Sequence, residues 1–454
     1  MIGSNKVRVV VVGLGPSGIG TILSLAKSNL APHILCLDAG DHLSMRSCSI
    51  LNDNYCRKEK LCQMVSGFGG CSLMGGGKVS LFPAGSALVE ILGSDALAKR
   101  AILRAIDVFG SYVNLKKPKI RTKDIKTAKD LYTQMGFEYK YYEAYSYNQS
   151  DLHKAYKRLF GELESKGVSL WLRTELIEIE RSKDCYRLTV KRGNELLSIS
   201  AKYVVLGLGR LGRTFLNSLN ARLNLNGSYN HLDVGVRLEF PKSICPDLTR
   251  YHNDLKLKFG SARTFCVCTD GKIAPYLLDD LFFTEGYYNP EDNSNFTNLG
   301  ILIRLPPSKE NERILEDIKK RCQSVGKGNL IYQLLNDYLA NNFEKNGPCE
   351  MLNSSISFGI GADINQCYPK PVSKEIRKAV RYFVYRLLSK DDWRKVNVFA
   401  PEVDYGGLYF PVQKDFSIIK NMFLVGECTG RFRGILQCLC SGMICGESIA
   451  SGDN

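Results

Sequence analysis

Six residues near the start of the chain have the types and spacing that hold a pyrophosphate. Gly13-Leu14-Gly15-Pro16-Ser17-Gly18 follows the pattern G-x-G-x-x-G. In such a motif the first glycine permits a tight turn, the second lets the backbone approach the phosphates, and the third lets helix and strand pack closely. The helix that follows points its N-terminal dipole at the phosphates. The motif therefore predicts a dinucleotide site, with Gly13, Gly15, Pro16, Ser17 and Gly18 as binding residues.

The elements that must position this motif can be recognised around it. A β-branched run covers residues 7–12, helical spacing covers 19–28, and a second apolar strand at 34–37 ends in Asp38. An acid about twenty residues after the last glycine is placed to accept hydrogen bonds from ribose hydroxyls. Together these features predict a Rossmann-type βαβ unit, in which Asp38 and Ala39 contact the ADP half of a dinucleotide.

The middle of the chain favours FAD over NAD. Residues 151–166 are typical of a crossover helix, and 168–172 of the next parallel strand. An antiparallel meander is predicted next, with strands at 176–180, 186–191, 196–201 and 203–208. By analogy of fold, a meander after a βαβ unit is the arrangement of the glutathione-reductase-like FAD domain. We therefore expect FAD as the cofactor, with Ile177 on the first meander strand beside it.

A second glycine motif follows the meander. Gly207-Leu208-Gly209-Arg210-Leu211-Gly212 repeats the spacing G-x-G-x-x-G. A separate NAD-binding unit would need another apolar strand ending in an acid, whereas residues 220–230 are polar and rich in asparagine. We interpret the motif as the end of the FAD domain's return strand, with Gly207 and Gly209 near the pyrophosphate.

The C-terminal region predicts the remaining cofactor contacts. An apolar strand at 423–427 ends in Glu427, and a helix is predicted over 435–450 after two further glycines. A strand that ends in glycine and acid, followed by a helix, is placed to contact the ribityl chain and the pyrimidine edge of a flavin. The expected cofactor contacts here are Gly426, Glu427, Gly434 and Ile435.

The predicted fold class is α/β, with a Rossmann-like FAD-binding domain and an inserted α+β substrate domain. The FAD-binding domain is expected to consist of residues 1–215 and 398–454, with the insertion at 216–397. Within the insertion we predict short strands at 234–240, 262–268 and 299–305 and an amphipathic helical stretch over 309–344.

Composition limits the class of protein. The chain has 454 residues, of which 44% are hydrophobic and 24% charged, as in globular proteins of two or three domains. No N-terminal signal or membrane-spanning run precedes the first motif, so we expect a cytoplasmic protein without a membrane partner. The sixteen cysteines are then expected to be reduced. Cys266/Cys268 and Cys438/Cys440 form C-x-C pairs that do not have zinc-site spacing, so no metal is predicted.

Net charge is the compositional outlier, at +15. Residues 99–129, here called the basic segment, contain ten cations and two acids. The cations are Lys99, Arg100, Arg104, Lys116, Lys117, Lys119, Arg121, Lys123, Lys126 and Lys129. A second basic run, 374–390, has a helical apolar face. Such an excess attracts nucleic acid or small anionic substrates, although a solvated surface has the same composition.

Several motifs together resemble one family. They are Arg46-Ser47-Cys48, the loop Ser66-Gly67-Phe68-Gly69-Gly70, Gly77-Lys78, Arg263-Thr264-Phe265-Cys266-Val267-Cys268 and Gly426-Glu427 with Gly434-Ile435. From end to end the chain resembles the NAD/FAD-utilising, FAD-dependent dehydrogenases, whose substrates are mostly unknown. The resemblance implies that Arg46, Gly67, Gly69 and Gly70 bind FAD.

The chain departs from this family at two places. Gly75-Gly76 stands where the family usually has Ser-Asp, so a carboxylate near the flavin is missing. Asp38-Ala39-Gly40 stands where the family has acid-Arg-Gly, which leaves the ribose contact in place. Related flavoproteins include lyases that oxidise amino-acid-modified thymidines of bacteriophage DNA. This relation makes modified DNA an alternative substrate.

The predicted reaction is two-electron oxidation of an amine or an activated C–H bond, with hydride transfer to flavin N5. The expected substrate is a small amine or anion. The candidate catalytic residues are Lys78, Arg263, Cys266 and Glu402, and the further candidate substrate contacts are Asp404, Tyr405, Arg431 and Arg433. Lys78 is alternatively a ligand of the FAD phosphates. Two other functions remain open, a lyase acting on modified DNA and a flavin-binding redox sensor without turnover.

Overall fold

A computed structural model describes residues 7–53, 55–343, 350–405 and 407–453. The first of its two large sheets has six strands in the order β24-β25-β10-β1-β2-β6. These are β24 (Ser417–Ile419), β25 (Met422–Leu424), β10 (Tyr203–Leu206), β1 (Val9–Val12), β2 (Ile34–Leu37) and β6 (Ser169–Trp171). All are parallel to their neighbours except the edge strand β24. This topology confirms the predicted βαβ unit and both return strands.

The two faces of this sheet pack against different elements, because side chains alternate along a strand. Val9 and Val11 face the helices α1 (Pro16–Leu25), α12 (Ile435–Gly452) and α6 (Gln149–Ser165). Val10 and Val12 face a three-stranded antiparallel meander and the helix α7 (Arg213–Leu223). The meander strands are β7 (Thr174–Arg181), β8 (Tyr186–Arg192) and β9 (Glu195–Ala201). The predicted fourth meander strand is β10, which lies in the parallel sheet instead.

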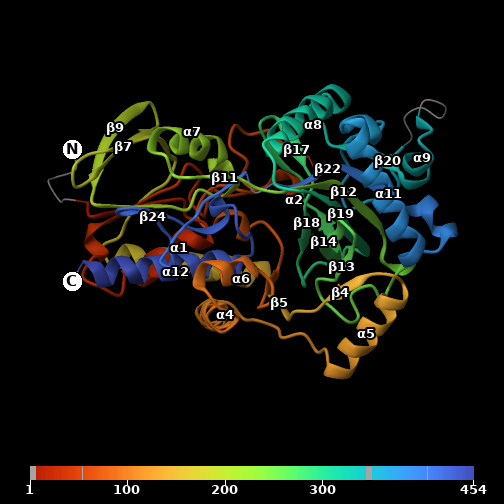
Figure 1. The fold of residues 1–454 in the computed structure, drawn as a ribbon, viewed down its shortest axis with the longest axis horizontal. Helices are drawn as coiled ribbons and strands as arrows, with labels where there is room; N and C mark the ends of the chain where they lie inside the picture. The colour runs from red at the N-terminus through yellow and green to blue at the C-terminus, as the bar shows by residue number, and fades with distance from the viewer. Residues whose placement is uncertain (1–6, 54, 344–349, 406, 454) are drawn as a thin grey trace.

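Helices α1 and α12 lie side by side under the six-stranded sheet (Figure 1). α12 has the length and apolar composition of a membrane-crossing helix, yet 61% of it is buried inside the protein. Its apolar side chains, among them Leu436, Leu439 and Met443, belong to the same core as α1. The composition of α12 is therefore that of a core helix.

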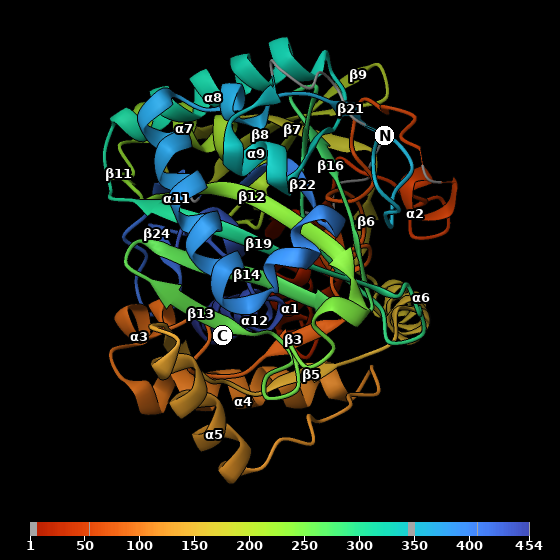
Figure 2. The same ribbon diagram turned by 90° about the vertical axis from the view of Figure 1, so that its right-hand side faces the viewer.

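The second large sheet has eight strands in the order β21-β20-β22-β12-β19-β14-β13-β4. They are β21 (Ile360–Gly361), β20 (Ile331–Leu334), β22 (Asn397–Tyr405), β12 (Leu232–Pro241), β19 (Phe296–Leu305), β14 (Ala262–Thr269), β13 (Lys256–Phe259) and β4 (Glu138–Lys140). Figure 2 shows α11 (Lys370–Leu387) lying across one face of this sheet. Ile376, Val380, Phe383 and Val384 of α11 are buried in that core, as their helical spacing predicts.

The other face of the eight-stranded sheet is buried but polar. Along β12, Leu232, Val234 and Val236 enter the apolar core. Their alternate neighbours Asp233 and Arg237 are fully buried on the opposite face. Because charged groups are rarely buried without partners, this polar face must be satisfied by ion pairs or by ligands.

Strand pairing links both predicted parts of the FAD-binding domain, 1–215 and 398–454, to the second sheet. β22 pairs with β12 along its length, so the second sheet continues past residue 397 to Tyr405. Within 1–215, β4 also joins this sheet, and α5 (Thr122–Gln134) packs beside it. Hydrogen bonding across the sheet decides these assignments, and no local composition signals it.

The predicted helical stretch 309–344 is also corrected. It contains α8 (Glu310–Gly326), the strand β20 and the short helix α9 (Leu335–Ala340), while Glu344 lies outside the described residues. Lys327 and Gly328 have positive φ of 47° and 74°, which ends α8. Ile331 and Tyr332 then pair with β22. The strand is therefore set by a tertiary partner.

Candidate FAD site

A cavity of about 380 Å³ lies at the carboxyl ends of β1, β2 and β10. This is the edge at which parallel α/β sheets bind nucleotides. Eleven of the predicted cofactor-binding residues line the cavity. They are Gly13, Gly15, Pro16, Ser17, Asp38, Ala39, Gly70, Gly207, Gly209, Glu427 and Ile435. The tertiary structure thus brings both glycine motifs and the start of α12 to one place.

The first glycine motif is shaped to leave space for a ligand. Gly13 has φ +95°, and a Cβ there would lie 2.2 Å from the Gly207 carbonyl oxygen, so the two motifs touch through backbone. A Cβ on Gly15 would meet only the Cα of Gly70, at 3.8 Å. Gly15 also lines the cavity. The missing side chain of Gly15 therefore opens a cradle to a ligand.

Asp38 organises the loops around the cavity. Its carboxylate accepts hydrogen bonds from the backbone N–H groups of Leu14 (2.7 Å), Gly40 (2.8 Å) and Gly67 (2.8 Å). A carboxylate has about four acceptor positions. Asp38 consequently fixes the glycine loops and retains capacity to accept from a ribose hydroxyl.

Arg46 supports the cavity from behind and does not line it. Its guanidinium donates to the carbonyl oxygens of Phe68 and Gln63, both at 2.6 Å. Burial lowers the pKa of Arg46 to about 10. The N–H of Gly69 donates to the carbonyl oxygen of Leu14 at 2.8 Å. Arg46, Gly67 and Gly69 thus hold the loop that presents Gly70 to the cavity.

Charged side chains gather near Glu427. The Oε1 atom of Glu427 lies 3.3 Å from Nε of Arg433 and 3.5 Å from Nε of Arg210. Arg210 donates to Glu285 at 2.9 Å. Burial raises the pKa of the Glu285 carboxyl, but the nearby Arg210 and Arg433 outweigh this effect and the pKa is lowered overall. Glu427 Oε1 and Arg210 Nε are both buried without a hydrogen-bond partner.

These features fit FAD. Gly15 leaves room for a pyrophosphate, and Asp38 is available to a ribose. The orphaned Oε1 of Glu427 suits a hydroxyl donor such as those of a ribityl chain. Ile435 brings the N-terminus of α12, with its positive dipole, to the same cavity. A cavity of this volume lies within the usual range for cofactor sites.

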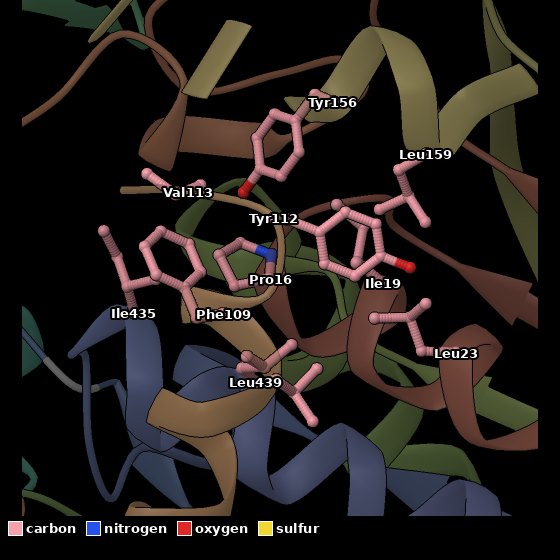
Figure 3. A pocket seen from close by; sticks show the side chains of 11 residues that line it. Pro16, Ile19, Leu23, Phe109, Tyr112, Val113, Tyr156, Leu159, Ile435 and Leu439 are labelled. Carbon is pink, nitrogen blue, oxygen red and sulfur yellow. The ribbon is translucent and has the colours of Figure 1, made fainter. Parts of the chain in front are cut away.

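A second, apolar pocket lies behind this site. Figure 3 shows Pro16 and Ile435 directed into it together with Phe109, Tyr112 and Leu439. Its volume is about 20 Å³, which is room for about one water molecule. It is too small for a substrate. Its lining packs the first turns of α1 and α12 against α4 (Asp95–Gly110) and α6.

None of the four predicted catalytic residues lines the 380 Å³ cavity. Lys78 is buried against the second sheet, where its Nζ donates to the carbonyl oxygens of Val267 (2.5 Å) and Asn253 (3.2 Å). Lys78 also lies 3.8 Å from Asp254. The donors of Lys78 are thus used outside the cavity, and its predicted contact with FAD phosphates or substrate stays a prediction.

Glu402, Arg263 and Cys266 belong to the polar face of the second sheet. Glu402 forms a two-point ion pair with Arg237, one bond being 2.7 Å, and also accepts from Thr284 at 2.6 Å. Arg263 donates to Asp233 and Asp404. Cys266 lies beside Cys268. Glu402 and Arg263 are thus members of buried ion pairs, and neither reaches the cavity.

The remaining predicted residues fall into two groups. Arg433 lines the cavity and bonds Asp404 at 2.6 Å, whereas Arg431 pairs with Glu90 at the surface. Ile177 is 43% exposed on β7, and its neighbours Glu175 and Leu176 line the cavity in its place. Gly18, Gly426 and Gly434 lie behind the lining. The side chain of Tyr405 lies outside those described.

Sequence reasoning missed several lining residues. They include Lys60, Cys62, Cys71, Arg210, Phe215 and Leu277. Arg210 sits inside the second glycine motif, so its position was a usable signal. Cys62 begins the segment that leads into the glycine-rich loop and Cys71 directly follows that loop, so they too lie beside a recognised motif. Lys60, Phe215 and Leu277 lie outside the motifs, and only chain folding brings them to the cavity.

No protein-family model matches the chain, and no curated protein matches its sequence. The comparison with solved structures matches, among others, a flavoprotein/dehydrogenase from Cytophaga hutchinsonii, with 12% identity over 98% of this chain and 78% of that one (TM-score 0.39). A p-nitrophenol 4-monooxygenase from Pseudomonas putida has the same values. A geranylgeranyl bacteriochlorophyll reductase-like protein from Thermoplasma acidophilum has 12% identity over 98% and 79% (TM-score 0.40). By its own strand order and meander, the chain has a Rossmann-type FAD-binding α/β fold.

Proposed function

We propose that the protein is an FAD-dependent oxidoreductase that oxidises a small amine or an activated C–H substrate by two electrons. The observation that carries the proposal is the single cavity that joins the Gly15 cradle and Asp38 to the charged region around Glu427. When bound, FAD supplies an acceptor for a hydride at N5. The protein's own groups bind, orient and shield the reactants.

Charges around the cavity favour a substrate with an anionic group. Arg210 and Arg433 both line it, and Glu427 is the acid that they share. Arg433 is also held by Asp404 and Glu285, so its guanidinium is fixed in place. A guanidinium recognises a carboxylate with two parallel hydrogen bonds, and a substrate carboxylate at Arg433 would take the place of one of its present acid partners, Asp404, Glu285 or Glu427. An amino acid or a related amine with a carboxylate therefore fits this end of the cavity.

Cofactor release and anaerobic reduction test the proposal. The purified protein is expected to be yellow and to release FAD on denaturation, which chromatography identifies. Candidate amines are then added without oxygen, and loss of the flavin absorbance near its visible maximum reports two-electron reduction. Release of only FMN or NAD would contradict the cofactor assignment. Bound FAD that no amine or C–H donor reduces would instead support a redox sensor without turnover.

A second candidate function, action on modified DNA, draws support from the basic segment. All ten of its cations are exposed, on and around α4 and α5. Arg104, Lys117 and Arg121 have acidic partners at Glu447, Glu143 and Asp124. None of the ten lines the cavity, so DNA held there would need a further path to the flavin. The basic segment suits phosphate contacts at the surface.

Salt dependence distinguishes this alternative from a solvated surface. Affinity for labelled duplex DNA is expected to fall with salt at a log-log slope of about −0.9 per phosphate neutralised. Neutralising Lys116, Lys117 and Lys119 should reduce the slope and leave the flavin spectrum unchanged. Neutralising Lys374, Lys378 and Lys390 of the second basic run is the matched control. Absence of binding at low salt would eliminate the DNA candidate.

A further inference from the structure

We propose that Cys266 and Cys268 are a redox-active dithiol, which closes to an intramolecular disulfide and forms a second oxidation site apart from the FAD cavity. Both residues are on β14 in the second sheet. Neither lines the cavity. The site therefore goes beyond the proposed flavin chemistry and does not depend on it.

The backbone of β14 brings the two sulfurs together. In a regular strand, residues i and i+2 point to the same face but stand more than 6 Å apart, at about 3.3 Å per residue. Here Cys266 has φ +44°, and the register against β19 shifts between Phe265 and Cys268. This irregularity leaves the two Sγ atoms 3.8 Å apart. Side-chain rotation can reduce this separation to the bonding distance of about 2.05 Å.

Buried cations surround the pair and favour a thiolate. The Lys78 ammonium lies 3.7 Å from the sulfur of Cys268. Arg237 donates to the carbonyl oxygen of Cys266 at 3.1 Å. The hydrogen bond from Cys266, followed by Lys78 and Arg237, lowers the pKa of Cys268 to about 7 against the effect of burial. The same hydrogen bond raises the pKa of Cys266. When the pair loses a proton, these contacts favour the thiolate on Cys268 over Cys266.

The two cysteines also differ in access. Cys268 is 1% exposed, whereas Cys266 is partly exposed beside it. Cys266 is therefore the thiol nearer to solvent, and an oxidant that reacts with the buried Cys268 must be small. Hydrogen peroxide is an oxidant of suitable size, and it reacts with thiolates in preference to thiols.

The reaction balances with hydrogen peroxide as the oxidant. The Cys268 thiolate attacks one peroxide oxygen, the O–O bond breaks, and a sulfenic acid forms on Cys268. The hydroxide that leaves takes the thiol proton of Cys266 and becomes water. The Cys266 thiolate then attacks the Cys268 sulfur, the S–O bond breaks, and the second hydroxide takes a proton from solvent. Two thiols and one peroxide give one disulfide and two waters.

The chain contains its own control, the second C-x-C pair. Cys438 and Cys440 lie on α12, where residues i and i+2 do not face each other. Burial raises the pKa of Cys438 and raises that of Cys440 to about 12. Equal spacing in the sequence therefore has opposite chemical consequences in the two elements.

The test uses the full chain, reduced and then treated with hydrogen peroxide at pH 7. Free thiols are alkylated in denaturant at successive times, and the masses of the digested peptides are measured by mass spectrometry. The peptide with Cys266 and Cys268 should lose two hydrogens and gain no alkyl group, while the peptide with Cys438 and Cys440 stays doubly alkylated. In Cys266→Ser the reaction should stop at a sulfenic acid on Cys268, which dimedone traps.

Lys78 variants separate an electrostatic role from a structural one. Lys78→Met should slow disulfide formation at pH 7 about fivefold, the loss of thiolate that follows when a pKa of about 7 rises by one unit, and Lys78→Arg should restore most of the rate. Two results would overturn the proposal. One is a doubly alkylated Cys266–Cys268 peptide after prolonged peroxide treatment of the native chain. The other is oxidation of Cys438 and Cys440 at the same rate.

Discussion

The wall of the FAD cavity and the polar face of the second sheet are both buried and both contain charged groups, but they are built in opposite ways. The cavity wall leaves a Cβ position open at Gly15, and Oε1 of Glu427 has ion-pair contacts to Arg433 and Arg210 but accepts no hydrogen bond. On the polar face, Arg237, Glu402 and Arg263 satisfy one another or their neighbours. The open Cβ position at Gly15, more than charged residue type, therefore distinguishes the cavity wall from the polar face.

The largest expected effect is the loss of FAD binding when the open position at Gly15 is filled. Gly15→Val should abolish FAD retention, because its side chain would enter the space for the pyrophosphate. Gly161→Val is the matched control, since Gly161 is exposed on α6 with no atom near its Cβ position. Absorbance and chromatography of released cofactor measure occupancy. Full FAD occupancy in Gly15→Val would show that the cradle has been assigned wrongly.

On the polar face of the second sheet, substitutions should change the free energy of unfolding. Arg237→Met leaves Glu402 buried without its ion-pair partner and should lower the free energy of unfolding by about 3 to 5 kcal/mol. The double variant Arg237→Met/Glu402→Leu should recover much of this loss, because a buried ion pair is often replaceable by packed apolar side chains. Denaturant titration measures both. If Arg237→Met were as stable as the native chain, water would have to reach the Arg237–Glu402 ion pair.

A pH titration sharpens the comparison at His252, which is fully buried against the rings of Tyr141 and Tyr142. Burial lowers the pKa of His252 from 6.5 to about 4. Below pH 6.5 the unfolded chain binds this proton more tightly, so stability should fall between pH 6.5 and 4, by about 3 kcal/mol in total.

Replacing His252 by Phe should remove this part of the pH dependence, whereas His33→Phe at the exposed His33 should not. Unfolding in denaturant at pH 7, 5.5 and 4 measures the difference. Equal pH dependence in the native chain and in His252→Phe would contradict a buried neutral imidazole.

The smallest expected effect concerns the orphaned acceptor. Glu427→Gln keeps the shape and an acceptor but removes the charge, so FAD should bind about five- to tenfold more weakly, because a hydrogen bond to a charged group contributes about 1 to 1.5 kcal/mol more than a neutral one. Glu90→Gln is the control, because Glu90 forms its ion pair with Arg431 at the surface and does not line the cavity. Flavin fluorescence during titration of the apoprotein gives both affinities. Unchanged affinity in Glu427→Gln would place the ligand elsewhere in the cavity.

Much of the cofactor side could be predicted because its signals are local. The spacing of Gly13, Gly15 and Gly18 and the apolar runs on either side of them specify strand, turn and helix within one short segment. The charged residues of the second sheet gave weaker signals of their function. Glu402 and Arg263 have catalytic residue types, yet each is paired with a residue far away in the sequence. Arg210 and Cys71 line the cavity although no catalytic role was predicted for them.

By itself the sequence determined the Rossmann-type unit, the meander and the two glycine motifs, because hydrophobic periodicity and glycine spacing act over a few residues. Only the tertiary structure decided which side chains meet. It joined β22 and β4 to one sheet, buried Lys78 beside Cys268, and placed Glu427 between Arg210 and Arg433. Such contacts depend on hydrogen bonding and packing between segments hundreds of residues apart, so identical C-x-C spacing became a thiol pair on β14 and two separated thiols on α12.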